Sequence, residues 1–250
     1  MEKISFRNKK GLKLRGVLQK GTNDRLVIMC HGFRSNRSSR GRFDRFAESF
    51  QRIGYHVLRF DFGGCGESED RPLSLESEVS DLTAAIDNAV SNGFTEIALY
   101  GHSLGARVCL ESYQPTYIKT MILTGAGTGP VTYDWKEEFT PSQLEELKET
   151  GYLKQPVQDP YREEIVISKQ MLVDFEQVDQ ERLLSSIQCP VLVVHGDQGE
   201  EEVLLPLTQK GMKWLPPSSH LTIIEGAPHS FEGYLDHVEK AAIDWLHKHF

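Results

Sequence analysis

Cysteine is scarce in this sequence and is not arranged as a covalent or metal-bound framework. Only four cysteines occur in 250 residues. Cys30, Cys65, Cys109 and Cys189 stand singly, and none belongs to a C-x-x-C pair. Isolated cysteines in apolar runs are typical of reduced thiols in a reducing compartment. We therefore expect no disulfide, no metal site and a cytoplasmic location.

Long hydrophobic runs are also absent. No stretch approaches the roughly 18 apolar residues that a membrane-spanning helix needs. The opening residues, MEKISFRNKKGLKLRG, alternate charges with single apolar side chains, whereas a signal peptide has a continuous apolar core. We expect neither a leader peptide nor a membrane partner.

Basic residues are fewer than acidic residues in this chain. The chain has 28 Lys and Arg against 36 Asp and Glu, a formal net charge of −8. Nucleic-acid binding needs a dense basic surface, so we expect no nucleic-acid partner. The one basic cluster, residues 34–45, is interpreted as a solvated loop and helix start. Recognition of an acidic group on a substrate is its alternative interpretation.

Internal repeats and low-complexity linkers are lacking as well, and no domain boundary is visible. Hydrophobic residues make up 39% of the chain and charged residues 26%, as in ordinary globular proteins. A chain of this length can bury one large core. We therefore expect a single domain over residues 1–250.

Short apolar runs alternate with segments of helical period, a pattern that predicts parallel strands joined by crossover helices. The later runs are apolar throughout, as in strands buried on both faces, and the first two are more polar, as in an antiparallel edge. The fold class expected is α/β, with a doubly wound, mostly parallel eight-stranded sheet. The predicted strands are 4–8, 13–20, 25–31, 55–61, 96–101, 118–124, 190–195 and 220–225.

Helical periods predict helices at 41–53, 76–92, 104–113 and 233–249. Residues 127–186, after the sixth strand, contain far more chain than a crossover requires. An insertion this long above a parallel sheet usually has its own helices and often covers a site. We expect a helical cap there.

The strongest local motif is G101-H-S-L-G105, a G-x-S-x-G that follows an apolar strand and precedes an apolar helix. This strand-turn-helix context is the one in which the motif presents a nucleophilic serine on a tight turn. Ser103 is therefore the candidate nucleophile. An ordinary glycine-rich turn is the alternative.

A serine hydroxyl needs an adjacent imidazole to accept its proton. His229 follows the last predicted strand, so it leaves the same carboxyl edge of the sheet as Ser103 and is the candidate base. His31 and His195 precede glycines at strand ends, where we expect structural hydrogen bonds. The histidines of 247–249 are expected to be solvated at a helix end.

The oxyanion of an acyl-transfer reaction needs backbone N–H donors. In H31-G-F33 the chain leaves a buried strand through glycine, so the N–H of Phe33 can point toward Ser103. Leu104 supplies a second N–H at the start of the next helix. A core aromatic is the alternative role for Phe33.

Together these motifs make the chain similar to the α/β-hydrolase superfamily, and within it to small intracellular carboxylesterases of the cinnamoyl or feruloyl esterase and monoacylglycerol lipase kind. The resemblance covers nearly the whole chain and is weakest in the insertion. It rests on H31-G-F33, R59-F-D-F-G-G-C-G-E-S68, G101-H-S-L-G105, P190-V-L-V-V-H-G-D197 and G226-A-P-H-S230.

The resemblance implies a triad acid after the seventh strand, in the order serine, acid, histidine. Counting three residues from Gly196 gives Gly199, which has no carboxylate. Counting back from the apolar Val203 gives Glu200, which we predict to be the acid. Asp197 is the main alternative, and the neighbouring Glu201 and Glu202 remain open.

The expected function is hydrolysis of a small-molecule carboxylic ester through an acyl-enzyme on Ser103. A thioesterase, an amidase or peptidase on the same residues, and a non-catalytic binding protein are the alternatives. No cofactor is expected, because G125-A-G-T-G129 resembles a dinucleotide-binding loop but lacks the amphipathic helix that should follow it. The chain is expected to be a monomer or homodimer.

Overall fold

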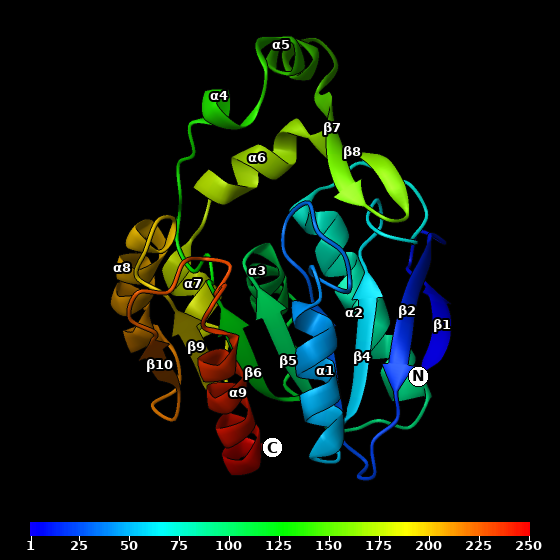
Figure 1. The fold of residues 1–250 in the computed structure, drawn as a ribbon, viewed down its shortest axis with the longest axis vertical. Helices are drawn as coiled ribbons and strands as arrows, with labels where there is room; N and C mark the ends of the chain where they lie inside the picture. The colour runs from blue at the N-terminus through cyan, green and yellow to red at the C-terminus, as the bar shows by residue number, and fades with distance from the viewer.

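The computed structural model describes residues 1–250 and is built on one eight-stranded sheet, in the order β1-β2-β4-β3-β5-β6-β9-β10 (Figure 1). All eight predicted strands are confirmed within two residues at each end. Their bounds are β1 Glu2–Arg7, β2 Lys13–Gln19, β3 Leu26–Cys30, β4 His56–Asp61, β5 Ile97–His102, β6 Ile118–Thr124, β9 Val191–His195 and β10 His220–Ile223.

The strand directions also follow the prediction. β1 pairs antiparallel with β2, and β2 pairs antiparallel with β4, whereas every other neighbouring pair is parallel. The central strands β3, β5 and β9 are buried along their whole length. Parallel strands covered on both faces need this continuous apolar character, and it is what made them recognisable in the sequence.

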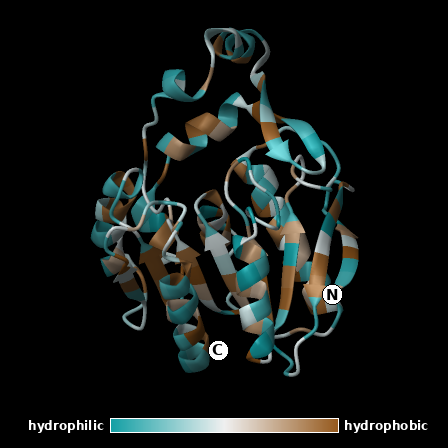
Figure 2. Cartoon of the chain, viewed as in Figure 1, coloured by the Kyte–Doolittle hydropathy of each residue, from teal (hydrophilic) through white to brown (hydrophobic).

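Helices cover both faces of the sheet, so the fold is doubly wound. Alternate residues of β3 point to opposite faces: Ile28 belongs to one core, and Val27 and Met29 belong to the other. The second core is closed by α1 (Arg42–Arg52) and α9 (Leu235–His249), and the first by α2 (Leu75–Ser91) and α3 (Leu104–Glu111). Figure 2 shows hydrophobic residues concentrated on the central strands between these helices.

The long segment between β6 and β9 contains helices, as expected, and also a two-stranded antiparallel hairpin that was not expected. Ile165 and Ile167, two residues apart, are its buried hydrophobic positions on β8, a period of two rather than the helical period. Figure 1 shows α4, α5, α6 and the hairpin together at the top of the molecule. The elements are α4 Trp135–Glu138, α5 Pro141–Thr150, β7 Tyr152–Asp159, β8 Arg162–Ser168, α6 Lys169–Glu176 and α7 Gln180–Ser185.

A helix that the sequence analysis did not predict follows β9. This helix, α8 (Glu201–Gly211), leads into the short 3₁₀ helix η1 (Met212–Trp214). It begins inside an acidic run and contains Pro206, and both features obscure its helical character. Its buried residues are Glu201, Leu204, Thr208 and Gly211, spaced three or four apart.

No helix of the fold combines the length and hydropathy that a bilayer-spanning segment requires. All four cysteines are free and buried.

Candidate active site

Ser103 occupies a strained turn between β5 and α3. Its φ of 56° and ψ of −123° lie in a region that a non-glycine residue rarely adopts. The flanking glycines allow the turn. A methyl carbon on Gly105 would lie 2.1 Å from the carbonyl oxygen of Cys30, and one on Gly101 would lie 2.6 Å from the Cα of Ala106. The turn therefore brings α3 against β3 and leaves Ser103 partly exposed.

His229 lies in the loop between β10 and α9, and its ring is fixed by a buried carboxylate. The Nδ1 atom is 2.5 Å from Oε1 of Glu201. The side chain of Glu201 is fully buried, whereas 21% of the His229 side chain is exposed. Because an ionised carboxylate only accepts hydrogen bonds, Nδ1 carries the proton and Nε2 is left to accept one.

The carboxylate of Glu201 is shared between two histidines, because its second oxygen, Oε2, contacts Nδ1 of His195. Burial would raise the pKa of Glu201, but the hydrogen bonds from His195 and His229 outweigh it and lower the pKa to about 2. Glu201 is therefore ionised at neutral pH. His195 is buried and hydrogen-bonded, as expected for a structural histidine.

A chain of buried polar groups, which begins at His195, fixes the position of this carboxylate. The Nε2 atom of His195 is 2.9 Å from Oγ1 of Thr208, which is 3.0 Å from Oγ1 of Thr128. Gln180 on α7 donates from Nε2 to Thr128 at 3.3 Å and to the carbonyl of Leu207 at 2.7 Å. Polar networks of this kind are rigid when every member is satisfied.

The prediction that Glu200 contacts Nδ1 of His229 is wrong. Glu200 accepts a hydrogen bond from the Tyr133 hydroxyl at 2.6 Å, and its Oε2 lies 3.6 Å from Nε2, on the opposite side of the imidazole. The reason is the direction of α8. Glu201 lies on the buried face of this helix, and Glu200, one residue earlier, faces the cavity.

The other candidate acids also lie away from Nδ1. Asp197 accepts a hydrogen bond from the N–H of Gly226 at 2.8 Å and so joins the loops that follow β9 and β10. Glu202 is exposed and accepts only a weak bond from the N–H of Gly199, at 3.3 Å. Neither carboxylate contacts His229.

The two predicted backbone donors border Ser103. The N–H of Phe33 makes no hydrogen bond within the protein, and Leu104 is the first residue of α3, where N–H groups have no partner within the helix. His31 fixes the peptide group of Phe33. It accepts from the N–H of Phe62 at 3.2 Å on Nε2, so Nδ1 donates to the carbonyl of Gly32 at 2.9 Å.

That carbonyl and the N–H of Phe33 belong to one trans peptide and point in opposite directions. A carbonyl held by His31 therefore turns the N–H of Phe33 away from the core. Burial lowers the pKa of His31, so the ring is neutral, as this arrangement requires.

Two further residues lie near the imidazole, and the sequence analysis did not assign either of them to the site. The ring centroid of His102 is 5.0 Å from that of His229, and burial, followed by Arg42 and His229, holds the pKa of His102 well below its usual value. Gly125, at the end of β6, has a φ of +55°, and a methyl carbon there would lie 2.7 Å from Cε1 of His229. Only the position of His102 within the G-x-S-x-G motif and that of Gly125 at the end of a strand could have indicated them.

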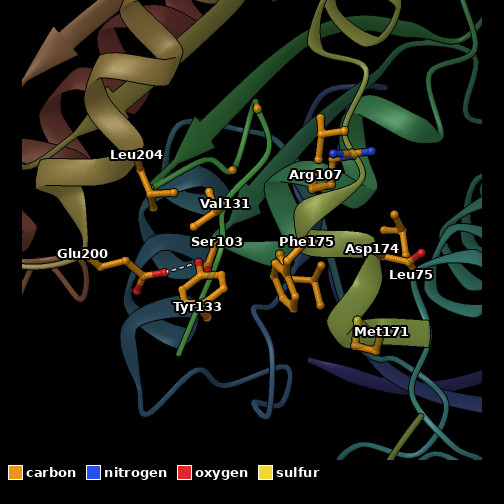
Figure 3. A pocket seen from close by; sticks show the side chains of 15 residues that line it. Leu75, Ser103, Arg107, Val131, Tyr133, Met171, Asp174, Phe175, Glu200 and Leu204 are labelled. Carbon is orange, nitrogen blue, oxygen red and sulfur yellow. Dashed lines mark hydrogen bonds between the residues drawn. The ribbon is translucent and has the colours of Figure 1, made fainter. Parts of the chain in front are cut away.

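Ser103 stands where two cavities meet. One has a volume of about 570 Å³ and is lined by Ser103, His229 and Phe33. The other has a volume of about 30 Å³, is mostly apolar and is lined by Ser103 and Leu104 (Figure 3). Ser103 and His229 share the larger cavity, but no hydrogen bond joins the hydroxyl to the imidazole. Such bonds are often long before a substrate binds.

No group of three or more His, Cys, Asp or Glu side chains is arranged to hold a metal ion. The polar groups around Ser103 are a hydroxyl, an imidazole, carboxylates and free N–H groups. These groups can perform nucleophilic and acid–base chemistry without further ligands.

Comparisons with known proteins give a family and several structural neighbours. Residues 27–241 match the model of the alpha/beta hydrolase family. Est1E from Butyrivibrio proteoclasticus, solved with ferulic acid bound, superposes with a TM-score of 0.78 at 22% identity over 98% of both chains. An esterase from Exiguobacterium antarcticum gives a TM-score of 0.72 at 16% identity, over 98% of this chain and 99% of that one.

Among curated proteins, the chain is similar to a 2-hydroxy-6-oxononadienedioate/2-hydroxy-6-oxononatrienedioate hydrolase from Escherichia coli O81 (strain ED1a). The two are 25% identical over 171 residues, which is 67% of this chain and 54% of the relative. The chain thus spans about half the length of the curated relatives it matches.

Proposed function

Because the chain belongs to the alpha/beta hydrolase family, we propose that it is a serine hydrolase that cleaves carboxylic esters through an acyl-enzyme on Ser103. One observation carries the proposal. The buried Glu201 carboxylate fixes Nδ1 of His229, and the imidazole lines the same cavity as a serine held in a strained turn. A nucleophile, a base and a group that orients the base are the parts that acyl transfer needs.

In the first half of the reaction, Oγ of Ser103 attacks the ester carbonyl while Nε2 of His229 accepts its proton. The negative charge that develops on the carbonyl oxygen is stabilised by the N–H groups of Phe33 and Leu104. The tetrahedral intermediate then collapses. The C–O bond to the alcohol breaks, the alcohol takes the proton from His229, and the acyl group stays on Ser103.

In the second half, water replaces the alcohol. His229 removes a proton from the water as it attacks the acyl-enzyme, and the proton returns to Oγ of Ser103 when the acid leaves. Glu201 stays ionised throughout and stabilises the imidazolium that forms in each half. The buried chain behind Glu201 keeps the carboxylate in one orientation, so little reorganisation is needed at the moment of proton transfer.

The choice of an ester is supported by the names of proteins of the same fold. Esterases from Thermogutta terrifontis and Exiguobacterium antarcticum share the fold, and Est1E was solved with ferulic acid. Thioesters and amides would use the same residues. A non-catalytic role has less support, because the strain at Ser103 is costly to maintain and an active site explains its presence.

The proposal is tested with the purified chain and p-nitrophenyl acetate, together with a fluorophosphonate probe that labels activated serines. We expect labelling at Ser103 and turnover of the ester. Ser103→Ala should abolish labelling and lower kcat/KM by about 10⁴ or more.

Acyl-CoA and aminoacyl anilide substrates, assayed in parallel, separate a thioesterase and an amidase from an esterase. A folded protein that neither reacts with the probe nor cleaves any substrate of the three classes would refute the proposal that the chain is a serine hydrolase.

A further inference from the structure

The site around Ser103 has two unequal branches, named here the wide branch (about 570 Å³) and the narrow branch (about 30 Å³). Tyr133, Phe175 and Glu200 line both, and together with Ser103 they form the junction. Figure 3 shows Tyr133 and Glu200 joined by their hydrogen bond beside Ser103. An ester bound at Ser103 must place its acyl part in one branch and its alcohol part in the other.

We propose that the substrates are short-chain acyl esters, acetates above all, of a large polyhydroxylated alcohol such as a sugar. This inference rests on the proposed function and adds the substrate class to it.

The direction follows from the position of the base. His229 must deliver its proton to the departing alcohol oxygen, so the alcohol leaves on the side of the imidazole. His229 lines the wide branch and not the narrow one. The alcohol therefore occupies the wide branch, and the acyl group is left with the narrow branch beside Leu104.

The size of the acyl group follows from the volume of the narrow branch. A cavity of about 30 Å³ has room for roughly two water molecules. Its walls include Val131, Met171 and Leu204, which are all buried and come from three different segments. Enlarging the branch would require displacement of packed side chains, which is unfavourable. An acetyl methyl group fits without this cost.

The alcohol is identified by the charges of the wide branch. Three arginines and three glutamates line it, so 3 − 3 leaves no net charge to select an anion or a cation. These residues are Arg34, Arg40, Arg42, Glu138, Glu200 and Glu232. Guanidinium groups only donate hydrogen bonds and carboxylates only accept them. A neutral molecule with several hydroxyl groups can satisfy both kinds at once.

Two of these residues are available for a ligand. Arg40 and Glu232 are exposed and make no side-chain hydrogen bond or ion pair, whereas Arg34 and Glu138 pair with each other at 2.9 Å. Trp135 lines only the wide branch and stacks on Phe139 with ring centroids 5.7 Å apart. Its ring gives the alcohol a flat apolar surface next to the polar groups.

The acyl arm of the test compares p-nitrophenyl acetate, butyrate and octanoate on the intact chain. We expect kcat/KM to fall at least about tenfold from acetate to octanoate. Val131→Ala, which widens the narrow branch, should raise the butyrate-to-acetate ratio of kcat/KM severalfold. Val203→Ala, an equal truncation at an exposed position of α8, should leave both the ratio and the activity unchanged.

The alcohol arm uses a monoacetylated methyl glucoside, whose other hydroxyl groups are free, with release of acetate measured by NMR. We expect turnover, and we expect Trp135→Ala to raise KM for the sugar acetate about tenfold while the acyl-chain ratios stay as in the parent. A preference for octanoate or methyl ferulate over acetate, or no turnover of the sugar acetate by an enzyme active on p-nitrophenyl acetate, would overturn the inference and leave the esterase proposal intact. Absence of all ester cleavage and of probe labelling would overturn both.

Discussion

Glu200 and Glu201 are adjacent in sequence but face opposite sides of one imidazole. Glu201 contacts Nδ1 of His229 from the buried face of α8, and Glu200 lies 3.6 Å from Nε2 within the cavity. In the proposed mechanism Glu201 orients the base, whereas Glu200 places a carboxylate beside the reacting atoms. The two residues therefore have different expected roles despite identical side chains.

Replacing each glutamate by glutamine separates these roles. Glu201→Gln should lower kcat for p-nitrophenyl acetate by about 10³ to 10⁴, because an amide no longer fixes the tautomer of His229. Glu200→Gln keeps the volume and the contact with Tyr133, and it should change kcat less than about tenfold. Equal losses in the two variants, measured by steady-state kinetics on folded protein, would contradict this assignment.

Gly125 allows the histidine and its acid to meet. Gly125→Ala would place a methyl carbon 2.7 Å from Cε1 of His229 and 2.9 Å from Oε1 of Glu201, so we expect kcat to fall about 10- to 100-fold. Gly11→Ala is the matched control. Its φ of +83° carries comparable backbone strain, and nothing lies within 4 Å of the added carbon. If the two variants lose activity equally, strain rather than the clash is responsible.

The sequence alone indicated some of the site residues and not others. Ser103 and His229 were predicted from a motif and from the edge of the sheet on which their loops begin, and the structure places both on one cavity. The carboxylate that contacts His229 was predicted to be Glu200 rather than Glu201 because it was sought by counting along a loop. The helical spacing of Glu201, Leu204 and Thr208, all buried, contains the missing signal, since only one of the three glutamates shares a face with those residues.

Among the elements, the hairpin β7–β8 joins the inserted segment to the main body. Leu73, in the loop before α2, bridges to Ile167 of β8, and its carbonyl accepts hydrogen bonds from Ser168. Ile167 is fully buried, and its core is continuous with that of the main sheet. The segment above the site is thus held by backbone pairing as well as by apolar contacts.

Truncation of the Ile167 side chain should affect the stability of more than the hairpin. Ile167→Ala should lower the free energy of unfolding by about 2–4 kcal/mol, and limited proteolysis should cut residues 127–186 faster. Val166→Ala, next to it on the half-buried face, should cost less than about 1 kcal/mol. Denaturant titration checks both values, and similar losses would show that the hairpin is not anchored through Ile167.

Some strands and helices could be predicted from the sequence and others could not. Strands buried on both faces were visible because nearly every residue in them is apolar, and the four predicted helices have clear amphipathic periods. The hairpin was missed because β7 (YLKQPVQD) has few apolar residues and contains a proline, and β8 (REEIVIS) begins with three charged residues. Such a strand pair is specified by its contact with Leu73 rather than by its own composition.

Across the whole molecule, a buried carboxyl group links stability to pH. Glu78 on α2 lies in the core, its Oε2 has no hydrogen-bond partner, and burial followed by the nearby Asp81 raises its pKa to about 8. An acid whose pKa is higher in the folded state holds its proton more tightly there. Its stabilising effect is therefore fully present below the unfolded pKa of about 4.5 and is lost as pH rises toward 8.

Glu78→Gln should remove this dependence. The variant should match the parent at pH 5 and exceed it at pH 9 by an amount on the order of 4 kcal/mol or less, measured as free energy of unfolding at each pH. Glu76→Gln, at an exposed position of the same helix, should follow the parent at every pH. A parent whose stability is flat from pH 5 to 9 would show that Glu78 is not perturbed.

The shared carboxylate of Glu201 has a consequence for anyone who wants an inert version of this protein. In the proposed mechanism Glu201 orients the base, and it also belongs to a buried polar chain, so variants at Glu201 are expected to lower the free energy of unfolding as well as kcat. The hydroxyl of Ser103, by contrast, makes no hydrogen bond within the protein. Ser103→Ala is therefore the substitution of choice for trapping an uncleaved ester in crystals.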